Sequence, residues 1–491
     1  MERIAATLRG KIMSAEKAAQ FIKTGMTLGM SGFTVVGYPK AVPAALCRSG
    51  HARDLTVCIG ASVGDELDGA MVRAGLIKAR YSYQSNPDMR RAINRGEVNY
   101  CDMHVSQFPR LINEGDSPQI DVAVVECSAV TEEGLVPTAA VGCMDAVVRA
   151  AEKVIIEVNE TLPTELYGMH DIFEVGVPPR AGCIPIFSPC DRVGTPYIPC
   201  EPEKIAAIVI TDKADQPAKF KPLTDETRMI GAHVADFLKA EISEGRLPEK
   251  LGPIQSGVGS VGNAILRSLS RSGFQGLTMY TEVMQDGALE LLERGVLSGV
   301  SASAVSLEEG TRKRFYEHLS DFHDKITIRP QEISNHPELI RRLGVVAINT
   351  PIEMDIYGSV NSTHVMGSRM MNGIGGSGDF ARNARLGIFA TPSTAQGGLI
   401  SCLVPMVSHV DHTEHDVQVI VTERGVADLR WKSPRERAEL LIENCAHPDY
   451  QPLLREYFER AVALSPGQHT PHDLETAFCF HQRYLHTGSM K

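Results

Sequence analysis

Residues 277–297 read LTMYTEVMQDGALELLERGVL, and their resemblance to an earlier stretch decides the fold. Residues 55–77 read LTVCIGASVGDELDGAMVRAGLI. In both stretches a short β-like run leads into a helical pattern. A second matching pair follows in the same order, VAVVECSAVTEEGLV at 122–136 and VAINTPIEMDIYGSV at 346–360. Two ordered matches at similar spacing predict two α/β units that arose by duplication. The alternative is two α/β domains that share only generic strand patterns.

The rest of the chain also has an α/β pattern. Further β-rich runs occur at residues 121–125, 153–157 and 205–210, and helical patterns occur at 14–23 and 87–95. Alternation of strands and helices favours largely parallel, buried sheets. The polar segment 211–225 has two prolines and many charges, so it is the expected linker. We therefore expect domains at residues 1–222 and 223–491, with a long helix running from residue 227 to 242.

Composition excludes several classes of protein. The 491 residues are 43% hydrophobic and 22% charged, which is ordinary for a globular protein that needs neither disulfides nor metals for its core. A net charge of −11 argues against general nucleic-acid binding but permits a small anionic ligand. The eleven cysteines include no C-x-x-C pair, which favours reduced thiols. Residues 1–23 carry charges throughout, and no apolar run approaches membrane-spanning length, so we expect a cytoplasmic protein without a membrane segment.

One acidic residue distinguishes the two similar units. Glu282 lies opposite Gly60 when the units are aligned, so only the second unit carries the acid. It follows a β-like run, and the carboxyl ends of strands line the ligand crevice of open α/β sheets. Taken alone, Glu282 could be a solvated cap, a ribose clamp, a general base or a nucleophile. A site in the crevice between the two halves is the first place to look.

Two glycine-rich loops accompany this acid. Residues 257–262 fit G-x-G-x-x-G, with Glu282 at about the distance of a ribose-binding acid, which raises a nicotinamide-binding alternative. A helix is plausible from residue 263, but the preceding 250–256 contain glycine and proline and predict a poor buried strand. The second loop, MNGIGGSGD at 371–379, can approach a ligand closely and present free N–H groups to an anion. Two such loops in the half with the acid favour a ligand site.

A histidine-rich run at residues 408–416 raises the question of a metal. His409, His412 and His415 are spaced three apart, with acids between them. The flanking residues 403–407 and 417–421 are strand-like, and no H-E-x-x-H pattern is present. We therefore expect a polar connection and no metal site.

Long motifs give the chain a family resemblance. It resembles the acetyl-CoA hydrolase/transferase family of class I CoA-transferases over almost its whole length. The motifs that carry the resemblance are SGFTVVGYPKAVP from Ser31, QSGVGSVGNA from Gln255, RPQEISNHPE from Arg329, NSTHVMGSRMMNGIGGSGDFARN from Asn361, VPMVSHVDH from Val404 and VTERGVADLR from Val421. The resemblance implies two similar CoA-transferase-type (NagB/RpiA-like) open-sheet α/β domains, usually in a homodimer.

The resemblance also implies an activity. It predicts transfer of CoA between short-chain carboxylates, with succinyl-CoA and acetate as the expected pair, and acyl-CoA as a substrate rather than a permanent cofactor. Acetyl-CoA hydrolysis, and propionyl-CoA:succinate transfer on the same scaffold, are the alternatives, and butyryl- and 4-hydroxybutyryl-CoA stay open as donors. A non-catalytic CoA-binding regulator is a further alternative, against which Glu282 and both intact glycine loops argue.

Individual site residues follow from the matched motifs. Glu282 matches the glutamate that forms a glutamyl-CoA thioester, and the backbone N–H groups of Val258 and Gly376 match the oxyanion-hole donors. Asn335 and Glu423 match further active-site positions, and Ser62 is expected to line the carboxylate side from the N-terminal domain.

The CoA-binding positions follow in the same way. The resemblance places the CoA-binding loop, and further CoA contacts, at Gly257, Val258, Gly259, Ser260, Val261, Asn335, Asn372, Gly376 and Gln396. The chain departs from the family at two positions. Relatives often have lysine where this chain has Gln396, which removes one charge contact to CoA, and glutamine is common where it has Arg424.

Overall fold

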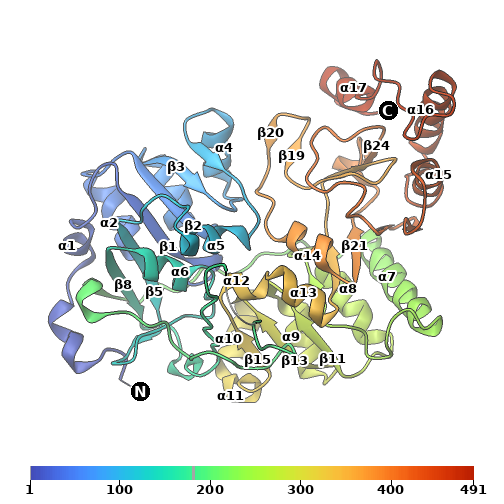
Figure 1. Cartoon of the computed structure of the whole chain (residues 1–491). Coiled ribbons are helices and arrows are strands. Elements are labelled where there is room, and N and C mark those ends of the chain that lie inside the picture. Colours follow the sequence, from blue (N-terminus) through green and yellow to red (C-terminus); the bar gives the residue numbers. More distant parts are fainter. Residues whose placement is uncertain (1, 180–182) are drawn as a thin grey trace.

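The computed structural model describes residues 2–179 and 183–491, and two open β-sheets organise it (Figure 1). The first sheet has the order β4-β3-β2-β1-β5-β8-β9, and all of its paired strands are parallel. Its strands are β1 (Thr27–Thr34), β2 (Leu55–Ser62), β3 (Ile77–Tyr81), β4 (Asn99–Cys101), β5 (Val122–Cys127), β8 (Lys153–Asn159) and β9 (Ile205–Thr211). The parallel α/β pattern predicted for this half is confirmed.

The second sheet has the order β15-β13-β11-β10-β16-β21-β25-β26. Its strands are β10 (Ile254–Ser256), β11 (Leu277–Tyr280), β13 (Leu297–Ala302), β15 (Ile326–Ile328), β16 (Val346–Asn349), β21 (Leu386–Ala390), β25 (Val419–Thr422) and β26 (Gly425–Asp428). All pairs are parallel except the hairpin of β25 with the edge strand β26.

The two sheets share one topology. The seven strands counted from the β4 edge of the first sheet correspond one by one to the seven counted from the β15 edge of the second. In both sheets, strands at the same place in space have the same rank in chain order. The two similar sequence stretches begin at the equivalent strands β2 and β11, and the second matching pair at β5 and β16. Each strand of the second pair also leads into an antiparallel ribbon: β5 into β6–β7 (Ala129–Val130, Leu135–Val136) and β16 into β17–β18 (Glu353–Asp355, Val360–Asn361). The duplication stays a prediction, and the shared topology is what it requires.

Helices cover both sheets and extend the second half. In the first half they are α1 (Ala15–Ala19), α2 (Ala41–Ser49), α3 (Ala70–Arg73), α4 (Pro87–Asn94), α5 (Gln107–Glu114) and α6 (Met144–Ala150). In the second half they are α7 (Asp225–Ser243), α8 (Ser260–Arg271), α9 (Asp286–Glu293), α10 (Glu309–Glu317), α11 (Leu319–Phe322), α12 (Gln331–Ser334), α13 (Pro337–Leu343), α14 (Ser377–Asn383), α15 (Pro434–Asn444), α16 (Gln451–Leu464) and α17 (Cys479–Thr487). Figure 1 shows α15 to α17 in red, beside the orange strands of the second half.

Short elements complete the chain. The remaining strands are β12 (Val283–Met284), β14 (Ala304–Val305), β19 (His364–Val365), β20 (Arg369–Met370), β22 (Thr394–Ala395), β23 (Ile400–Ser401) and β24 (Leu403–Val404). The short helical turns are η1 (Ala6–Lys11), η2 (Asp65–Gly69), η3 (Thr164–Leu166), η4 (Pro202–Lys204) and η5 (Gln396–Gly398).

The expectation of a poor buried strand before the first glycine loop was wrong. Residues Ile254–Ser256 form β10, which is buried between β11 and β16 inside the second sheet. The glycine and proline that argued against a strand, Gly252 and Pro253, lie just outside it. A strand of three residues is long enough here because its neighbours extend the sheet on both sides. The glycine motif therefore stands in a strand–turn–helix context, between β10 and α8.

The expected linker forms no helix or strand between Thr211 and Asp225, as predicted, but it is not a solvated tether. Asp215 is buried within it, and the Ala218 amide donates to the carbonyl of Leu307 in the second half at 3.1 Å. The predicted long helix follows as α7, which Thr224 caps by accepting from the Thr227 amide.

Three smaller expectations can be compared with the structure. Residues 408–416 form no helix and no named strand, in agreement with the expected polar connection. All eleven cysteines lie in the described part of the chain and are free thiols, five of them buried. Among the described residues, no helix combines the length and apolar character needed to cross a bilayer.

Candidate active site

A cavity of about 480 Å³ lies between the two halves. Its wall combines first-half residues in and just after the carboxyl ends of β1 and β2, residues after β3, residues of the expected linker, and both glycine loops of the second half. The lining residues used below are Phe33, Thr34, Val35, Ala61, Val63, Ala218, Lys219, Phe220, Gly257, Val258, Glu282, Asn372, Gly373, Ile374, Gly375, Gly376 and Ser377. The expected position of a site in the crevice between the halves agrees with this cavity.

Glu282 is held rigidly on the cavity wall. It lies between β11 and β12, and its carbonyl accepts hydrogen bonds from the amides of Ser303 at 2.8 Å and Ala304 at 3.1 Å. The side-chain amide of Asn335 donates to its carboxylate oxygen Oε1 at 2.6 Å. A Cβ atom at Gly376 would lie only 1.6 Å from the same oxygen, so only glycine fits there. The carboxylate therefore has one fixed donor and touches the backbone of the second glycine loop.

The surroundings of Glu282 make it a weak acid. Burial raises the pKa of Glu282 to about 7, and the nearby negative charge of Asp379 acts in the same direction. The hydrogen bond from Asn335 opposes both effects because it stabilises the ionised form. A poorly solvated carboxylate that ionises near neutrality can act as a nucleophile or as a proton acceptor.

Two glycines of the first glycine loop are required for different reasons. Gly259 has a φ of +130°, which side chains disfavour. A Cβ atom at Gly262 would lie 2.3 Å from the carbonyl oxygen of Gly257, so Gly262 lets α8 pack against the turn. No side chain caps α8. Its first N–H groups are thus available for an anionic group of a ligand.

Gln285, which the sequence motifs did not single out, fixes this loop. Its side-chain oxygen accepts from the Gly259 amide at 2.9 Å, and its side-chain nitrogen donates to the Gly257 carbonyl at 3.1 Å. Gln285 stands three residues after Glu282, so the stretch that carries the acid also carries the clamp of the glycine loop. The closeness of Gln285 to Glu282 in the sequence was the signal that could have indicated its role.

The second glycine loop is held by the first half of the chain. The Ile374 amide donates to the carboxylate of Asp102 at 2.6 Å. A Cβ atom at Gly373 would lie 2.6 Å from an oxygen of that carboxylate, so glycine permits the close approach. Asn372 lies on the cavity wall, and its side-chain amide donates to the carbonyl of Ser362 at 3.0 Å.

Two residues of the cavity wall have backbone amides without a protein acceptor in the described part of the chain. Within residues 2–179 and 183–491, the N–H groups of Val258 and Gly376 donate to no backbone or side-chain atom. Both residues line the cavity, and Gly376 adjoins the Glu282 carboxylate. Free, fixed donors beside a nucleophile are suited to stabilising negative charge on oxygen.

Family models match both halves of the chain. The acetyl-CoA hydrolase/transferase N-terminal domain matches residues 2–210, and the C-terminal domain of the same family matches residues 310–458. The chain belongs to the acetyl-CoA hydrolase/transferase family. The family predicted from the sequence motifs is thereby confirmed.

Curated relatives of this family resemble the chain over nearly its full length. It is 50% identical to the succinyl-CoA:acetate CoA-transferase of Clostridium kluyveri, over 99% of this chain and 91% of that protein. It is 43% identical to the acetyl-CoA hydrolase of Schizosaccharomyces pombe, over 97% and 95%. It is 42% identical to the propanoyl-CoA:succinate CoA transferase of Escherichia coli, over 97% and 98%.

Solved structures show the same fold. RipA from Yersinia pestis superposes with a TM-score of 0.72 at 24% identity, over 93% of this chain and 98% of that one. The 4-hydroxybutyrate CoA-transferase of Porphyromonas gingivalis superposes with a TM-score of 0.65 at 24% identity, over 92% and 98%. The α/β fold expected from the family resemblance is confirmed.

Some residues that the family resemblance selects lie off the cavity wall. The hydroxyl of Ser62 is buried, and among the described residues it has no hydrogen-bond partner, whereas its neighbours Ala61 and Val63 line the cavity. Glu423 lies in the turn between β25 and β26, where the amide of Ser393 donates to it at 2.7 Å. Gln396 is exposed, and its side-chain oxygen accepts from the Tyr484 hydroxyl at 2.9 Å. The remaining predicted residues gather around Glu282 or along the first glycine loop.

His412, which the sequence suggested only as a candidate metal ligand, supports the second glycine loop. It is buried, and its Nε2 lies 3.0 Å from the hydroxyl of Ser377, whose Oγ donates to the Ile374 carbonyl at 3.1 Å. Burial lowers the pKa of His412 to about 4, so the ring is neutral. Within the described residues, no group of three or more His, Cys, Asp or Glu is arranged to hold a metal ion.

Proposed function

We propose that this protein is a CoA-transferase that moves CoA between short-chain carboxylates through a thioester on Glu282. The position of Glu282 carries the proposal: its carboxylate is fixed on the cavity wall by Asn335, against the backbone of Gly376. A glutamate can carry CoA temporarily because it is itself a carboxylate, and its thioester has about the same energy as that of the substrate.

The first half-reaction begins with ionised Glu282. A carboxylate oxygen attacks the thioester carbonyl of acyl-CoA, and a tetrahedral oxyanion forms. The carbon–sulfur bond then breaks, which leaves an acyl-glutamyl anhydride and CoA thiolate. The thiolate attacks the Glu282 carbonyl carbon, and the acyl group departs as a carboxylate. No general base is required, because the nucleophile is already ionised.

The second half-reaction runs these steps backwards with another carboxylate. The acceptor carboxylate attacks the carbonyl carbon of the Glu282 thioester, and CoA thiolate leaves. The thiolate then attacks the acceptor's carbonyl carbon in the resulting anhydride, which releases the new acyl-CoA and restores the Glu282 carboxylate. The amides of Val258 and Gly376 are proposed to hold the oxyanions, and loss of one such donor typically costs about 3 kcal/mol. The loop Gly257 to Val261, which includes the free amides at the start of α8, is proposed to bind an anionic part of CoA. Asn372, in the second glycine loop, is proposed as a further CoA contact.

Succinyl-CoA and acetate are the proposed substrate pair. The 50% identity to a succinyl-CoA:acetate CoA-transferase supports this pair. The E. coli relative supports propionyl-CoA and succinate as an alternative pair on the same scaffold. Hydrolysis of acetyl-CoA is the second candidate function, and the identity to the fission-yeast hydrolase favours it. The two functions differ in whether water or a carboxylate reaches the Glu282 thioester.

Substitution of Glu282 tests the proposed chemistry. Glu282→Ala and Glu282→Gln are expected to lower transfer by roughly 10³-fold or more, because the covalent carrier is lost. In the unmodified enzyme, incubation with acyl-CoA should add CoA to Glu282, and borohydride should reduce that thioester; intact-protein and peptide mass spectrometry detect both. A fully active Glu282→Ala enzyme would refute the proposal.

A comparison of acceptors separates transfer from hydrolysis. Release of free CoA from succinyl-CoA or acetyl-CoA is measured with and without added acetate or succinate. A transferase forms a new acyl-CoA only when an acceptor is present and releases little free CoA without one. Rapid CoA release that no acceptor suppresses would identify a hydrolase. A panel of acyl-CoA donors against carboxylate acceptors then defines the preferred pair.

The organisation of the molecule is proposed on the same basis. Domains at residues 1–222 and 223–491 are supported by the sheets, whose strands lie within residues 27–211 and 254–428. A homodimer is what the family resemblance implies, and the cytoplasm is the location expected from the sequence pattern. Light scattering on the purified protein measures its mass in solution.

A further inference from the structure

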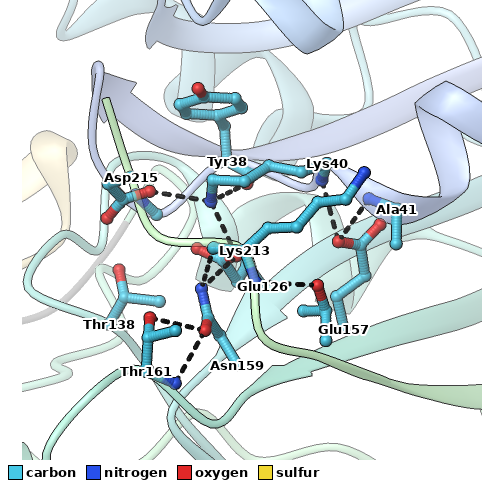
Figure 2. Close-up of polar contacts among 12 residues, drawn as sticks. Tyr38, Lys40, Ala41, Glu126, Thr138, Glu157, Asn159, Thr161, Lys213 and Asp215 are labelled. Atoms are coloured by element: carbon cyan, nitrogen blue, oxygen red, sulfur yellow. Dashed lines mark hydrogen bonds and ion pairs between the residues drawn. The ribbon is translucent and has the colours of Figure 1, made fainter.

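Lys40 is a fully buried cation on the loop between β1 and α2. Figure 2 shows its ammonium group among three oxygen atoms. Nζ lies 2.7 Å from a carboxylate oxygen of Glu126, 2.7 Å from one of Asp215, and 2.9 Å from the Tyr38 carbonyl. The side chains of Lys40 and Asp215 are 0% and 2% exposed. A charge this far from water persists only when it is well paired.

The charge on Lys40 is stable in this setting. Burial acts to lower the pKa of Lys40, but the charges of Asp215 and Glu126 outweigh it and raise the pKa above its usual range. Its backbone is fixed as well, because Glu157 accepts the amides of Lys40, Ala41 and Val42 at 2.7–2.9 Å, at the start of α2 (Figure 2). Lys40 is thus a rigid anchor in the first half.

Asp215 belongs to the linker segment, defined here as residues 212–224. Its carboxylate accepts from the amide of Gly37 at 3.1 and 3.2 Å, and its carbonyl accepts from Arg312 at 2.6 Å. The carbonyl of Lys213 accepts from the Asn159 side chain at 2.7 Å. The Asp215 side chain is therefore the ionic attachment of the linker segment to the first half.

The same contact joins two parts of the cavity wall. Three residues beyond Asp215, the linker segment contributes Ala218, Lys219 and Phe220 to the wall. The end of β1 contributes Phe33 and Thr34, and the following loop, which carries Gly37 and Lys40, contributes Val35. Lys40 and Asp215 are not among the lining residues themselves, but their ion pair connects two wall segments that lie far apart in the sequence.

We propose that Lys40 is a positioning residue which, through Asp215, holds the linker segment closed over the cavity and thereby protects the Glu282 thioester from water. The inference rests on the proposed function. The step that it limits is hydrolysis: the oxygen of water attacks the Glu282 carbonyl carbon, and the carbon–sulfur bond breaks. CoA leaves as the thiol with one proton from water, the second proton passes to solvent, and the ionised Glu282 carboxylate is restored. Exclusion of water leaves the acceptor carboxylate as the nucleophile.

Asp215→Asn tests this role with the smallest change. The side chain keeps its shape, but it loses its charge and presents an NH₂ group in place of an oxygen that now accepts from Lys40 or Gly37. Lys40 keeps Glu126 as a partner, so the buried cation is not left unpaired. Asp225→Asn is the matched control, because it lies just past the same segment and its ion pair with Arg228 is on the surface. Lys40→Met is the second variant.

The decisive measurement is the lifetime of the CoA adduct on Glu282 in the absence of an acceptor. Each enzyme is loaded with succinyl-CoA, freed of excess substrate, and followed by mass spectrometry and thiol release. We expect Asp215→Asn to form the adduct but to lose it to water roughly tenfold faster or more, since a displaced wall admits water that the closed site excludes. Asp225→Asn should match the unmodified enzyme.

A second readout reports the position of the linker segment itself. Lys213 and Lys219 are trypsin sites within it, and in Asp215→Asn they should be cut faster than in Asp225→Asn. A general loss of folded protein would lower the amount of adduct but would leave its lifetime unchanged.

The outcomes separate this inference from the proposed function. Absence of any CoA adduct on Glu282 in the unmodified enzyme overturns the proposed function. An adduct that forms in both enzymes, and that survives as long in Asp215→Asn as in the unmodified enzyme, overturns the role of Lys40 and leaves the proposed function standing.

Discussion

The character of the site is set first at the scale of single residues, by the balance around Glu282. Burial raises the pKa of Glu282 to about 7, whereas the Asn335 hydrogen bond lowers it. Desolvation makes the carboxylate a better nucleophile, but it also leaves part of the enzyme protonated near neutral pH. Activity and ionisation are therefore coupled at one side chain.

This coupling predicts a pH dependence. The ionised form is the nucleophile, so kcat/KM should be constant well above pH 7 and should fall as pH decreases through about 7, toward a tenfold loss per pH unit. Initial rates with succinyl-CoA and acetate across pH 5–9 measure it. The apparent pKa belongs to the free enzyme, because kcat/KM is the quantity compared.

Asn335→Ala supplies the accompanying test of sign. It removes the hydrogen bond that favours the ionised carboxylate, so the acid limb should move to higher pH. A limb that stayed in place or moved to lower pH would contradict the assignment of Glu282 as the titrating group. Asp379 also titrates nearby, since burial raises the pKa of Asp379 to about 6.

At the scale of secondary-structure elements, the site consists of strand ends and glycine turns. Glu282 follows β11, the first glycine loop joins β10 to α8, and the second precedes α14. The glycines permit contacts that any side chain would block. Gln285 and His412 then hold the two turns in place from neighbouring segments.

Gly376→Ala tests this requirement for close contact. The added methyl group would lie 1.6 Å from the Glu282 oxygen and 2.1 Å from the Asn335 nitrogen, so the carboxylate must move. We expect kcat to fall by roughly 10²-fold or more, because the nucleophile and an oxyanion donor are displaced together. Steady-state kinetics measure the loss.

The control for this substitution is Gly310→Ala in α10. An added Cβ atom at Gly310 meets nothing within 4 Å, so activity should be unchanged and stability should rise slightly. Equal activity of Gly376→Ala and the unmodified enzyme would show that the loop does not constrain Glu282.

At the scale of the whole molecule, the halves meet through polar contacts that lead to the nucleophile. Ser106 in the first half donates from its amide at 3.0 Å and from its hydroxyl at 2.6 Å to the carboxylate of Asp379 in the second. Asp379 accepts from Asn335 at 3.2 Å, and Asn335 donates to Glu282. The contact between the halves thus supports the carboxylate that is proposed to react.

Ser106→Ala tests this connection. Loss of the hydroxyl should lower the free energy of unfolding by about 1 kcal/mol. It should also lower kcat/KM by roughly fivefold, if the same energy is lost from the transition state. Denaturant titration and kinetics measure the two effects. Ser117→Ala is the matched control, because its exposed hydroxyl donates only to the neighbouring Pro118 carbonyl; an equal effect in both variants would refute the connection.

Local pattern was sufficient for much of this protein. The alternation of strands and helices, the repeat of the 55–77 pattern at 277–297, the long helix α7 and the family motifs around Glu282 were readable because each depends on residues close together in sequence. Strand β10 was misjudged for the same reason: Gly252 and Pro253 dominate the local pattern, whereas the sheet around β10 determines its structure.

Only the tertiary structure decided which residues meet. Asn335 and Gly376 contact Glu282 from separate elements. Asp215, which lies within a polar, proline-containing segment, pairs with Lys40, 175 positions away in the chain. Burial sets the pKa of Glu282 and the pairing of Lys40, and burial depends on how distant segments pack. Residue types and their local periodicity are therefore properties of the sequence, whereas the cavity and its electrostatics arise when the two halves close together.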